Sequence, residues 1–326
     1  MPRSADVPDL VRQARDGSPR AVARLVSLVE DASPALREVA AALAPLTGHA
    51  RVVGITGAPG VGKSTTTSAV VRGLRARGER VAVLAVDPSS PFTGGALLGD
   101  RIRMQDHALD PGVFIRSMAT RGHLGGLSWA TPQAVRVLDG AGFDVVLVET
   151  VGVGQSEVEV AGLADVTVVL LAPGMGDGVQ AAKAGILEVG DVFVVNKADR
   201  DGVQATVRDL RHMISLGMPD GPRSPQDPPR WRPPVLTTVA STGQGIEELL
   251  GELDRHRDWA TTTGELRGRR LRRAEREVEA IAVTALRERM GEVGRGERLG
   301  ELAARVVDAE VDPYAAADQL LSAVTG

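Results

Sequence analysis

The chain contains 326 residues, carries a net charge of −4 and has no cysteine. The slightly acidic balance argues against a nucleic-acid or anionic-membrane partner, and the missing thiols exclude disulfides and thiolate metal sites. No run of about 18 apolar residues occurs, and the N-terminal stretch MPRSADVPDL lacks the apolar core of a secretion signal. We therefore expect a soluble, cytoplasmic protein with one sizeable α/β domain and smaller appendages.

Residues 1–47 are predicted to form a helical extension. The segments 8–16, 19–30 and 34–46 each begin with a proline, which suits the first turn of a helix. Apolar residues in the middle segment follow helical spacing, so one face is expected to be buried. These residues are Val22, Leu25, Val26 and Val29. No catalytic pattern is visible, and the extension is interpreted as a packing or regulatory appendage.

A glycine-rich turn at residues 57–64, GAPGVGKS, matches the phosphate-binding pattern G-x-x-x-x-G-K-[ST]. An apolar run at 52–55 precedes it and a proline-free segment at 64–77 follows, so the turn joins a predicted strand to a predicted helix. Glycine tolerates the backbone angles that let N–H groups point at phosphate oxygens. Lys63 is expected to reach the β- and γ-phosphates, and the Ser64 hydroxyl to ligate Mg²⁺. The predicted phosphate-binding residues are Gly57, Ala58, Pro59, Gly60, Val61, Gly62, Lys63, Ser64 and Thr65.

From residue 51 onward, apolar runs alternate with helical segments, which is the pattern of a parallel sheet with helical crossovers. The runs are continuous, as expected for strands that are buried on both faces. The predicted strands cover residues 52–55, 81–86, 113–115, 144–149, 166–171, 192–195 and 235–239. The predicted fold class is therefore α/β, with a mostly parallel sheet flanked by helices around the phosphate loop.

Acidic residues follow two of these strands, at the edge where ligands bind in open α/β sheets. Asp87 follows the second strand, with a capping role as the alternative, and Glu149 ends the fourth. In phosphate-loop proteins an acid in this place holds Mg²⁺, and the extra methylene of glutamate favours a contact through water. Gln155 lies in the next segment, where no positioned base is evident. Asp100, in a glycine-rich loop, is unremarkable by itself.

Residues 196–199, NKAD, match the guanine-reading pattern N-K-x-D. The Asp199 carboxylate is expected to accept from N1–H and the exocyclic amine of guanine, a donor pair that adenine does not present. The Lys197 stem is expected to pack on the base, and Asn196 to tie loops together. A backbone N–H just after the last strand is expected to bind guanine O6. The residues there are Ala240, Ser241 and Thr242.

Residue usage supports these motifs. Among 38 basic residues three are lysine, and the chain has a single asparagine, Asn196. Lys63 and Lys197 both fall inside the nucleotide motifs. A chain so rich in arginine is expected to keep lysine where a guanidinium does not replace an ammonium, because the two groups differ in shape and hydration.

Three stretches lie outside the motifs. Proline-rich residues 217–234 are interpreted as a rigid surface excursion, with a polyproline ligand as the alternative. The arginine-rich run 267–276 is interpreted as a solvated or partner-facing helix, since glutamates are interleaved and aromatic residues are absent, which disfavours a nucleic-acid site. A last helix is predicted from Pro313 to about residue 324, capped by Asp312.

In combination, several stretches resemble the MeaB/ArgK-type GTPases, chaperones of adenosylcobalamin-dependent acyl-CoA mutases such as methylmalonyl-CoA mutase. These stretches are VDPSSPFTGGALLGDRIRM, SMATRGHLGGLS, VETVGVGQSE, PGMGDGVQAAKAGILE and NKADR. The resemblance covers most of the chain, from about residue 10 onward. It implies an N-terminal helical extension at 1–47, a P-loop GTPase domain at 48–250 and a C-terminal helical dimerisation arm at 251–326.

The resemblance also implies a site. Residues at the family's Mg²⁺ and γ-phosphate positions are Ser64, Asp87, Asp100 and Glu149. The residues assigned to catalysis are Lys63, Asp100, Glu149 and Gln155. Switch segments are implied at about 87–105, 151–160 and 172–185, the last containing Asp177, Gln180 and Lys183. One departure from the family is Gly178, where many members carry Glu.

The function implied by the resemblance is a GTP-hydrolysing chaperone that gates cofactor loading of such a mutase. Its ligands are GTP or GDP and Mg²⁺, it forms a homodimer, and no nucleic-acid or membrane partner is expected. One alternative is a metal-insertion GTPase, against which zero cysteines and five scattered histidines argue. The other is a small-molecule kinase or transport ATPase, which a comparison of ATP with GTP binding distinguishes.

Overall fold

The computed structural model describes residues 6–87, 105–107, 109–119, 130–150, 156–174, 186–217, 229–294 and 297–325. The chain divides into two compact units, Met1–Arg270 and Leu271–Gly326. The boundary between them lies inside α12 (Glu265–Gly294). The division into three domains at residues 47 and 250 stays a prediction. Among the helices in the described ranges, none has the length and apolar character that crossing a membrane requires.

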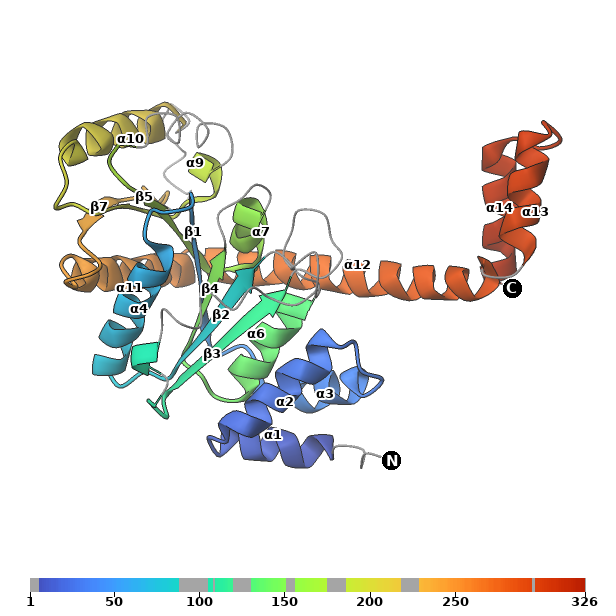
Figure 1. Ribbon diagram of the computed structural model, residues 1–326, viewed down its shortest axis with the longest axis horizontal. Helices are drawn as coiled ribbons and strands as arrows, with labels where there is room; N and C mark the ends of the chain where they lie inside the picture. Colours follow the sequence, from blue (N-terminus) through green and yellow to red (C-terminus); the bar gives the residue numbers. More distant parts are fainter. Residues whose placement is uncertain are drawn as a thin grey trace. The chain divides into compact units, whose positions relative to one another are not determined.

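The first unit begins with the predicted helical extension. Its elements are α1 (Val7–Arg15), α2 (Pro19–Glu30), α3 (Leu36–Leu43) and the 3-10 turn η1 (Ala44–Leu46). Asp6 and Ser18 cap the first two helices, because their side chains accept from backbone N–H groups of the first turn. The buried face of α2 packs on α6 (Ala130–Gly140), so the extension joins the core of this unit (Figure 1).

The sheet has seven strands in the order β3-β2-β4-β1-β5-β6-β7, and each strand pairing is parallel. The predicted α/β class is confirmed. In register, Glu149 lies opposite Ile55 of β1 and opposite Ala85 of β2, two residues before the last residue of each neighbour. The strands are β1 (Arg51–Gly57), β2 (Val81–Asp87), β3 (Val113–Ala119), β4 (Val145–Thr150), β5 (Val166–Leu171), β6 (Val192–Asn196) and β7 (Val235–Thr238).

Helices cover both faces of the sheet, which explains the continuous apolar runs. Along β1, Val53 and Ile55 belong to the core beneath α4 and α11, whereas Val52 belongs to the core with α6 and α7. The helices α4 and α11 lie side by side on one face (Figure 1). The helices that follow β1, β4, β5, β6 and β7 are α4 (Lys63–Ala76), α7 (Ser156–Leu163), α9 (Ile186–Val189), α10 (Val203–Gly217) and α11 (Ile246–Thr262).

Strand β3 is longer than the sequence predicted, since it continues to Ala119. The apolar run 113–115 is interrupted by Arg116, which is why the prediction stopped there. In the fold, the Arg116 guanidinium pairs with Glu30 and bonds to the Ser27 hydroxyl, both on α2. The N-terminal extension therefore supplies a carboxylate partner to a cation on the edge strand of the sheet, and a local pattern does not reveal this.

The second unit is helical in its described residues. It contains the rest of α12, then α13 (Glu297–Val307) and α14 (Pro313–Thr325). The last two helices pack through Leu302, Ala316 and Leu320. The predicted cap at Asp312 is confirmed: its carboxylate accepts from the N–H groups of Tyr314 at 2.9 Å and Ala315 at 3.0 Å.

Candidate nucleotide site

The phosphate loop joins β1 to α4 at the carboxyl edge of the sheet. Three of its glycines adopt positive φ: Gly57 at 141°, Gly60 at 80° and Gly62 at 98°. A Cβ at Gly57 would overlap the carbonyl oxygen of Leu170, and one at Gly62 would overlap the amide of Asn196. Glycine is required at these two positions both by backbone conformation and by the neighbouring strands.

Lys63 is the first residue of α4, and 8% of it is exposed. Its Nζ donates to the carbonyl oxygens of Gly57 at 2.8 Å and Ala58 at 3.1 Å. The Lys63 ammonium is therefore held against the backbone of the phosphate loop. A compact ammonium suits two closely spaced acceptors, whereas the planar fork of a guanidinium does not, which agrees with the retention of lysine here.

Glu149 lies near the end of β4 and is 3% exposed. Its Oε1 accepts from the Ser64 hydroxyl at 2.7 Å, and its Oε2 accepts from the Thr67 hydroxyl, also at 2.7 Å. Each carboxylate oxygen therefore receives a hydroxyl from the same face of α4. The fold brings two of the predicted Mg²⁺ ligands, Ser64 and Glu149, into direct contact.

Asn196 ends β6 and connects three parts of the site. Its amide nitrogen donates to the carbonyl oxygen of Val61 in the phosphate loop at 2.9 Å. Its carbonyl oxygen accepts from the Thr238 hydroxyl and from the Ala240 N–H, both at 3.1 Å. The side chain thus links the phosphate loop, the N-K-x-D motif and the loop after β7.

The two charged residues of the N-K-x-D motif flank the phosphate loop differently. Lys197 has a positive φ of 58°, and its Nζ donates to the carbonyl oxygen of Gly60 at 2.6 Å. Its stem therefore runs toward the phosphate loop. Asp199 is exposed, and no described residue donates a hydrogen bond to its carboxylate. Lys197 thus contacts the phosphate loop, while the carboxylate oxygens of Asp199 face solvent.

The loop after β7 leaves one of the three predicted N–H donors available. The Ala240 N–H donates to Asn196, and the Thr242 N–H donates to the carbonyl oxygen of Val239 at 3.0 Å. Among the described residues the Ser241 N–H has no acceptor. The geometry therefore favours Ser241 for a contact with guanine O6.

Several predicted site residues lie outside the described residues. Asp100 and Gln155 belong to this group, as do the segment 175–185 and its residues Asp177, Gln180 and Lys183. Asp87 is described as the last residue of β2, without its side chain. Its backbone lies at the same edge as Glu149, because β2 and β4 are neighbours in the sheet.

Sequence analysis missed Thr67, which contacts Glu149 as closely as Ser64 does. The signal was present in the run STTT at residues 64–67. A hydroxyl three residues after Ser64 returns to the same side of a helix, so it also faces the strand that carries the acid. The other two threonines of the run, Thr65 and Thr66, do not bond to Glu149.

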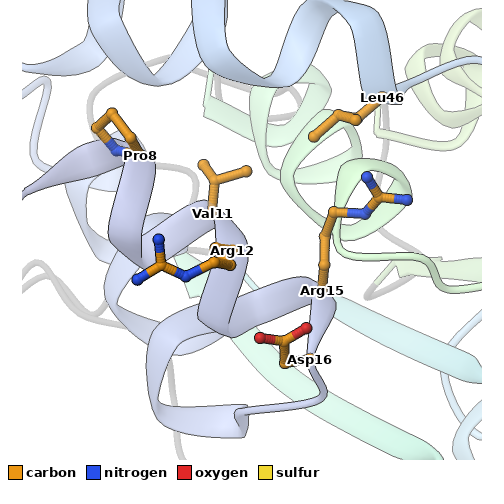
Figure 2. Close-up of a pocket in the computed structure, with 6 residues that line it drawn as sticks. All are labelled: Pro8, Val11, Arg12, Arg15, Asp16 and Leu46. Carbon is orange, nitrogen blue, oxygen red and sulfur yellow. The ribbon is translucent and has the colours of Figure 1, made fainter.

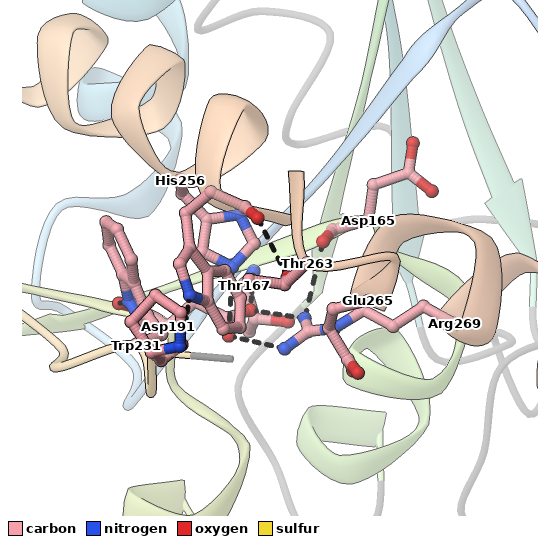
Figure 3. A network of polar contacts seen from close by, with 10 residues as sticks. Asp165, Thr167, Asp191, Trp231, His256, Thr263, Glu265 and Arg269 are labelled. Atoms are coloured by element: carbon pink, nitrogen blue, oxygen red, sulfur yellow. Dashed lines mark hydrogen bonds and ion pairs between the residues drawn. The ribbon is translucent and has the colours of Figure 1, made fainter. Parts of the chain in front are cut away.

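A second polar cluster lies at the opposite edge of the sheet, just before β6 (Figure 3). The Asp191 carboxylate accepts from both terminal nitrogens of Arg269 at 2.7 Å and from the Thr167 N–H at 2.8 Å. Burial by itself raises the pKa of Asp191, but the contacts of its carboxylate with His256 and with the Arg269 guanidinium outweigh burial and lower that pKa to about 2. His256 Nε2 is 3.4 Å from Asp191 Oδ1.

Asp165, just before β5, has a similar partner. Its Oδ2 accepts from Arg270 at 2.8 Å and from the Val52 N–H at 3.1 Å. Arg270 also donates to the carbonyl oxygens of Gly48 at 2.6 Å and Ala50 at 2.9 Å. Arg269 and Arg270 fall in the run 267–276, so the prediction of a solvated or partner-facing helix is wrong for these two residues. They bond to the amino edge of the sheet.

The proline-rich loop also packs against this edge at its described end. The Trp231 Nε1–H donates to the carbonyl oxygen of Asp191 at 2.7 Å, and the Trp259 Nε1–H donates to that of Pro229 at 2.7 Å. The Trp231 ring lies edge-on to His256, with centroids 4.8 Å apart. The Trp231 side chain and the Pro229 carbonyl therefore attach the described end of the loop to this edge; residues 218–228 lie outside the described part of the chain.

A surface hollow of about 460 Å³ lies between α1 and η1 (Figure 2). Its lining combines apolar side chains with two guanidinium groups and one carboxylate, and none of these residues belongs to a nucleotide motif. The lining residues are Pro8, Val11, Arg12, Arg15, Asp16 and Leu46. The nucleotide motifs converge elsewhere, at the carboxyl edge of the sheet.

Comparison with known proteins agrees with the geometry of the carboxyl edge. The family profile described as "Methylmalonyl Co-A mutase-associated GTPase MeaB" matches residues 22–294. The chain is 46% identical over 324 residues to a Pyrococcus abyssi protein that is a GTPase by name, covering 98% of this chain and 97% of that one. It is 39% identical to the GTPase ArgK of Escherichia coli, covering 82% and 80%.

Two further similarities extend the comparison. The chain is 40% identical over 218 residues to the mouse protein named methylmalonic aciduria type A homolog, mitochondrial, covering 67% of this chain and 52% of that protein. Among solved structures, one described as an LAO/AO transport system kinase superposes with a TM-score of 0.69 at 29% identity, covering 100% of both chains.

Proposed function

This chain belongs to the MeaB family of methylmalonyl-CoA mutase-associated GTPases, and from that premise we propose that it gates cofactor loading of an adenosylcobalamin-dependent acyl-CoA mutase. It is a GTPase. The finer proposal has three parts: Mg²⁺ assists GTP hydrolysis, the working form is a homodimer, and the client is a mutase of the methylmalonyl-CoA type. The names of the family and of its mouse relative support the choice of client.

One observation carries the proposal: the phosphate loop, the acid of β4 and the base motif meet at one edge of the sheet. Glu149 bonds to Ser64 at 2.7 Å, and Asn196 bonds to Val61 at 2.9 Å. Segments that are 85 and 135 residues apart in sequence are thereby joined around the same loop. Such convergence is what a guanine nucleotide requires, since its base and phosphates are read by different segments.

The donor set suits Mg²⁺. Magnesium prefers oxygen ligands and binds through one or two carboxylates together with substrate phosphates and water. Ser64 and Glu149 provide a hydroxyl and a carboxylate in contact, and Asp87 and Asp100 are the further predicted ligands. When bound, the ion neutralises charge that develops on the β- and γ-phosphate oxygens.

The chain's own residues account for binding and charge stabilisation. Backbone N–H groups of the phosphate loop are proposed to bind phosphate, and Lys63 supplies a cation beside the loop. Asp199 and the Ser241 N–H select guanine by accepting from N1–H and the amine and by donating to O6. Gln155 stays the predicted residue for orienting the attacking water, outside the described residues.

The GTPase alone is expected to be slow. The motifs include no arginine that would stabilise the γ-phosphate in the transition state. P-loop GTPases without such a cation hydrolyse GTP at roughly 10⁻⁴ s⁻¹. A client or a second copy of the chain is proposed to complete the site. For the homodimer, α12 offers an apolar stripe with exposed Leu271, Val278 and Ile281, which are 58%, 66% and 51% exposed in the single chain.

The test is phosphate release from GTP, with and without a purified methylmalonyl-CoA mutase. We expect slow release alone and a rise of about 10–10³-fold with the mutase, because completing a phosphoryl-transfer site supplies up to about 10³–10⁵-fold. A client that prefers the GTP form must also tighten GTP, by about 5–150-fold. No change in either quantity contradicts the proposed client.

A variant in the segment 172–185 sharpens this test. We expect Lys183→Ala to keep basal GTP binding and basal hydrolysis and to lose stimulation by the mutase, since the segment matches no base or phosphate motif yet follows β5 at the nucleotide edge. Equal stimulation of the variant and the wild type removes Lys183 from the mechanism. Loss of basal activity places it in the nucleotide site instead.

The alternatives predict different results. A small-molecule kinase or transport ATPase prefers ATP, whereas the N-K-x-D motif predicts that ATP does not displace a fluorescent GDP analogue. A metal-insertion GTPase is stimulated by the apo-form of a metalloenzyme, not by the mutase. The chain lacks the cysteine ligands such a protein uses to carry metal.

A further inference from the structure

We propose that Thr67 is a positioning residue for nucleotide-linked Mg²⁺ binding, because its hydroxyl fixes the Glu149 carboxylate against Ser64. The inference rests on the proposed function, in which Ser64 and Glu149 serve the metal. Thr67 lies on α4, outside the phosphate-binding pattern.

The geometry places Thr67 at the far oxygen of the acid. Its Oγ1 is 2.7 Å from Glu149 Oε2, while Ser64 Oγ is 2.7 Å from Oε1. Both hydroxyls come from one side of α4, three residues apart, so they hold the carboxylate as a pair. Thr67 is fully buried at 0% exposure and Glu149 is 3% exposed, so water does not compete for these bonds.

The length of the acid explains why a second hydroxyl is needed. Glutamate has one more torsion than the aspartate common at this place, and its terminal torsion is broad and poorly fixed by packing alone. The Ser64 hydroxyl bonds to Oε1 and the Thr67 hydroxyl bonds to Oε2, so the two contacts together restrict the terminal torsion of Glu149.

A purely helical role does not account for the contact. Threonine in a helix often bonds back to the carbonyl oxygen four residues earlier, and Thr67 Oγ1 lies 3.0 Å from that of Lys63. A hydroxyl has one hydrogen, and the nearer and charged acceptor is Glu149 Oε2 at 2.7 Å. Thr66 makes the same kind of bond to Gly62 at 3.0 Å and is equally buried at 0% exposure. The difference between the two neighbours is the bond to Glu149, which makes Thr66 a matched control.

The experiment compares Thr67→Val, Thr67→Ser and Thr66→Val in the full chain. The readout is the affinity for a fluorescent GDP analogue, titrated with Mg²⁺ and repeated with the metal chelated. We expect Thr67→Val to weaken the Mg²⁺-dependent gain in affinity by about 10–100-fold, the range for a lost hydrogen bond to a charged group. Affinity without metal should match the wild type. Thr67→Ser and Thr66→Val should keep the gain.

Three outcomes contradict the assignment. Equal Mg²⁺ dependence in Thr67→Val and Thr66→Val shows that the bond to Glu149 does not matter. A Thr67→Ser variant as damaged as Thr67→Val shows that the methyl group, not the hydroxyl, is responsible. A wild-type protein whose GDP affinity ignores Mg²⁺ overturns the proposed metal and Thr67 together. If Thr67→Val does not fold, Thr67→Ala against Thr66→Ala makes the same comparison.

Discussion

The carboxyl and amino edges of the sheet both gather polar side chains, but in different ways. At the carboxyl edge, polar residues come in contiguous motifs, and acceptors such as Asp199 face solvent. At the amino edge, Asp165 and Asp191 are buried and each pairs with one arginine of α12, 105 and 78 residues away in the chain. The carboxyl edge therefore leaves polar groups available to a ligand, whereas the buried carboxylates of the amino edge are paired within the chain.

This difference separates two roles: the carboxyl edge is proposed to bind a ligand, whereas the amino edge attaches α12 to the sheet. A ligand such as GTP is read by short segments that must each present several groups at once, so their residues are close in sequence. An attachment needs just one pair, and its members are free to be anywhere in the chain. Variants at the two edges should therefore change different quantities, and this expectation supplies the following tests.

The largest effect is expected for Lys63→Arg. GTP hydrolysis should fall by about 10³-fold, since Lys63 stabilises charge that develops in the transition state and the wider guanidinium does not fit its two carbonyl acceptors. GDP affinity should change by less than about tenfold, because ground-state binding depends on many backbone donors. Single-turnover hydrolysis and GDP titration measure the two effects. Near-normal turnover contradicts the argument from lysine retention.

Asp191→Asn should affect stability instead. Removing the charge leaves the Arg269 guanidinium, 23% exposed, with Glu265 as its remaining carboxylate partner, and breaking a buried pair costs about 3 kcal/mol. Denaturant unfolding measures the loss. Asp254→Asn is the control, because Asp254 pairs with Arg51 and Arg77 but is 49% exposed, so we expect a loss below about 1 kcal/mol. Equal losses in the two variants contradict the attachment role.

Asp199→Asn should lower the affinity for the nucleotide and leave the stability of the fold unchanged. The carboxylate loses its charge and one acceptor for the guanine donor pair, so GTP affinity should fall by about 100-fold or more, while stability stays the same. A xanthosine nucleotide, which carries an acceptor in place of the amine, should partly restore binding. Asp201→Asn, at a nearby exposed position outside the motif, is the control. Unchanged GTP affinity in Asp199→Asn refutes the assignment of the motif.

The smallest effect concerns pH. The pKa of Asp191 is lowered from 3.8 to about 2 in the folded chain. A depressed carboxyl pKa adds stability that is present above the unfolded value and is lost as pH falls through the folded value. The stability difference between the wild type and Asp191→Asn should therefore shrink by about 2 kcal/mol between about pH 4 and pH 2. A difference that is constant over this window contradicts the ion pair with Arg269.

The same contrast explains what the sequence reveals. The α/β class and the phosphate loop follow from contiguous patterns, because a strand–turn–helix unit is specified locally. The bond from Asn196 to the phosphate loop agrees with its predicted role of tying loops together, whereas the role of Glu149 in holding Mg²⁺ stays a prediction. The predicted strand was too short where Arg116 interrupts the apolar run, since its partners on α2 are 86 and 89 residues away.

Long-range pairs escape local analysis for the same physical reason. Arg269 and Arg270 resemble their solvated neighbours in the run 267–276, and nothing nearby distinguishes them. Their partners Asp165 and Asp191 each precede a strand directly, which is the signal that was available. Thr67 is an intermediate case: its spacing from Ser64 is local, but its meaning depends on Glu149, which is 82 residues away.

The most direct test of the division between the edges uses β6, which connects them. Asp191 precedes this strand, and the N-K-x-D motif begins at its last residue, Asn196. GDP affinity and unfolding free energy should be measured for Asp191→Asn, Asp199→Asn and the double variant. The account predicts that Asp191→Asn changes stability, that Asp199→Asn changes affinity, and that the effects add within about 0.5 kcal/mol. A tenfold or greater loss of GDP affinity in Asp191→Asn, at a temperature where it is fully folded, contradicts it.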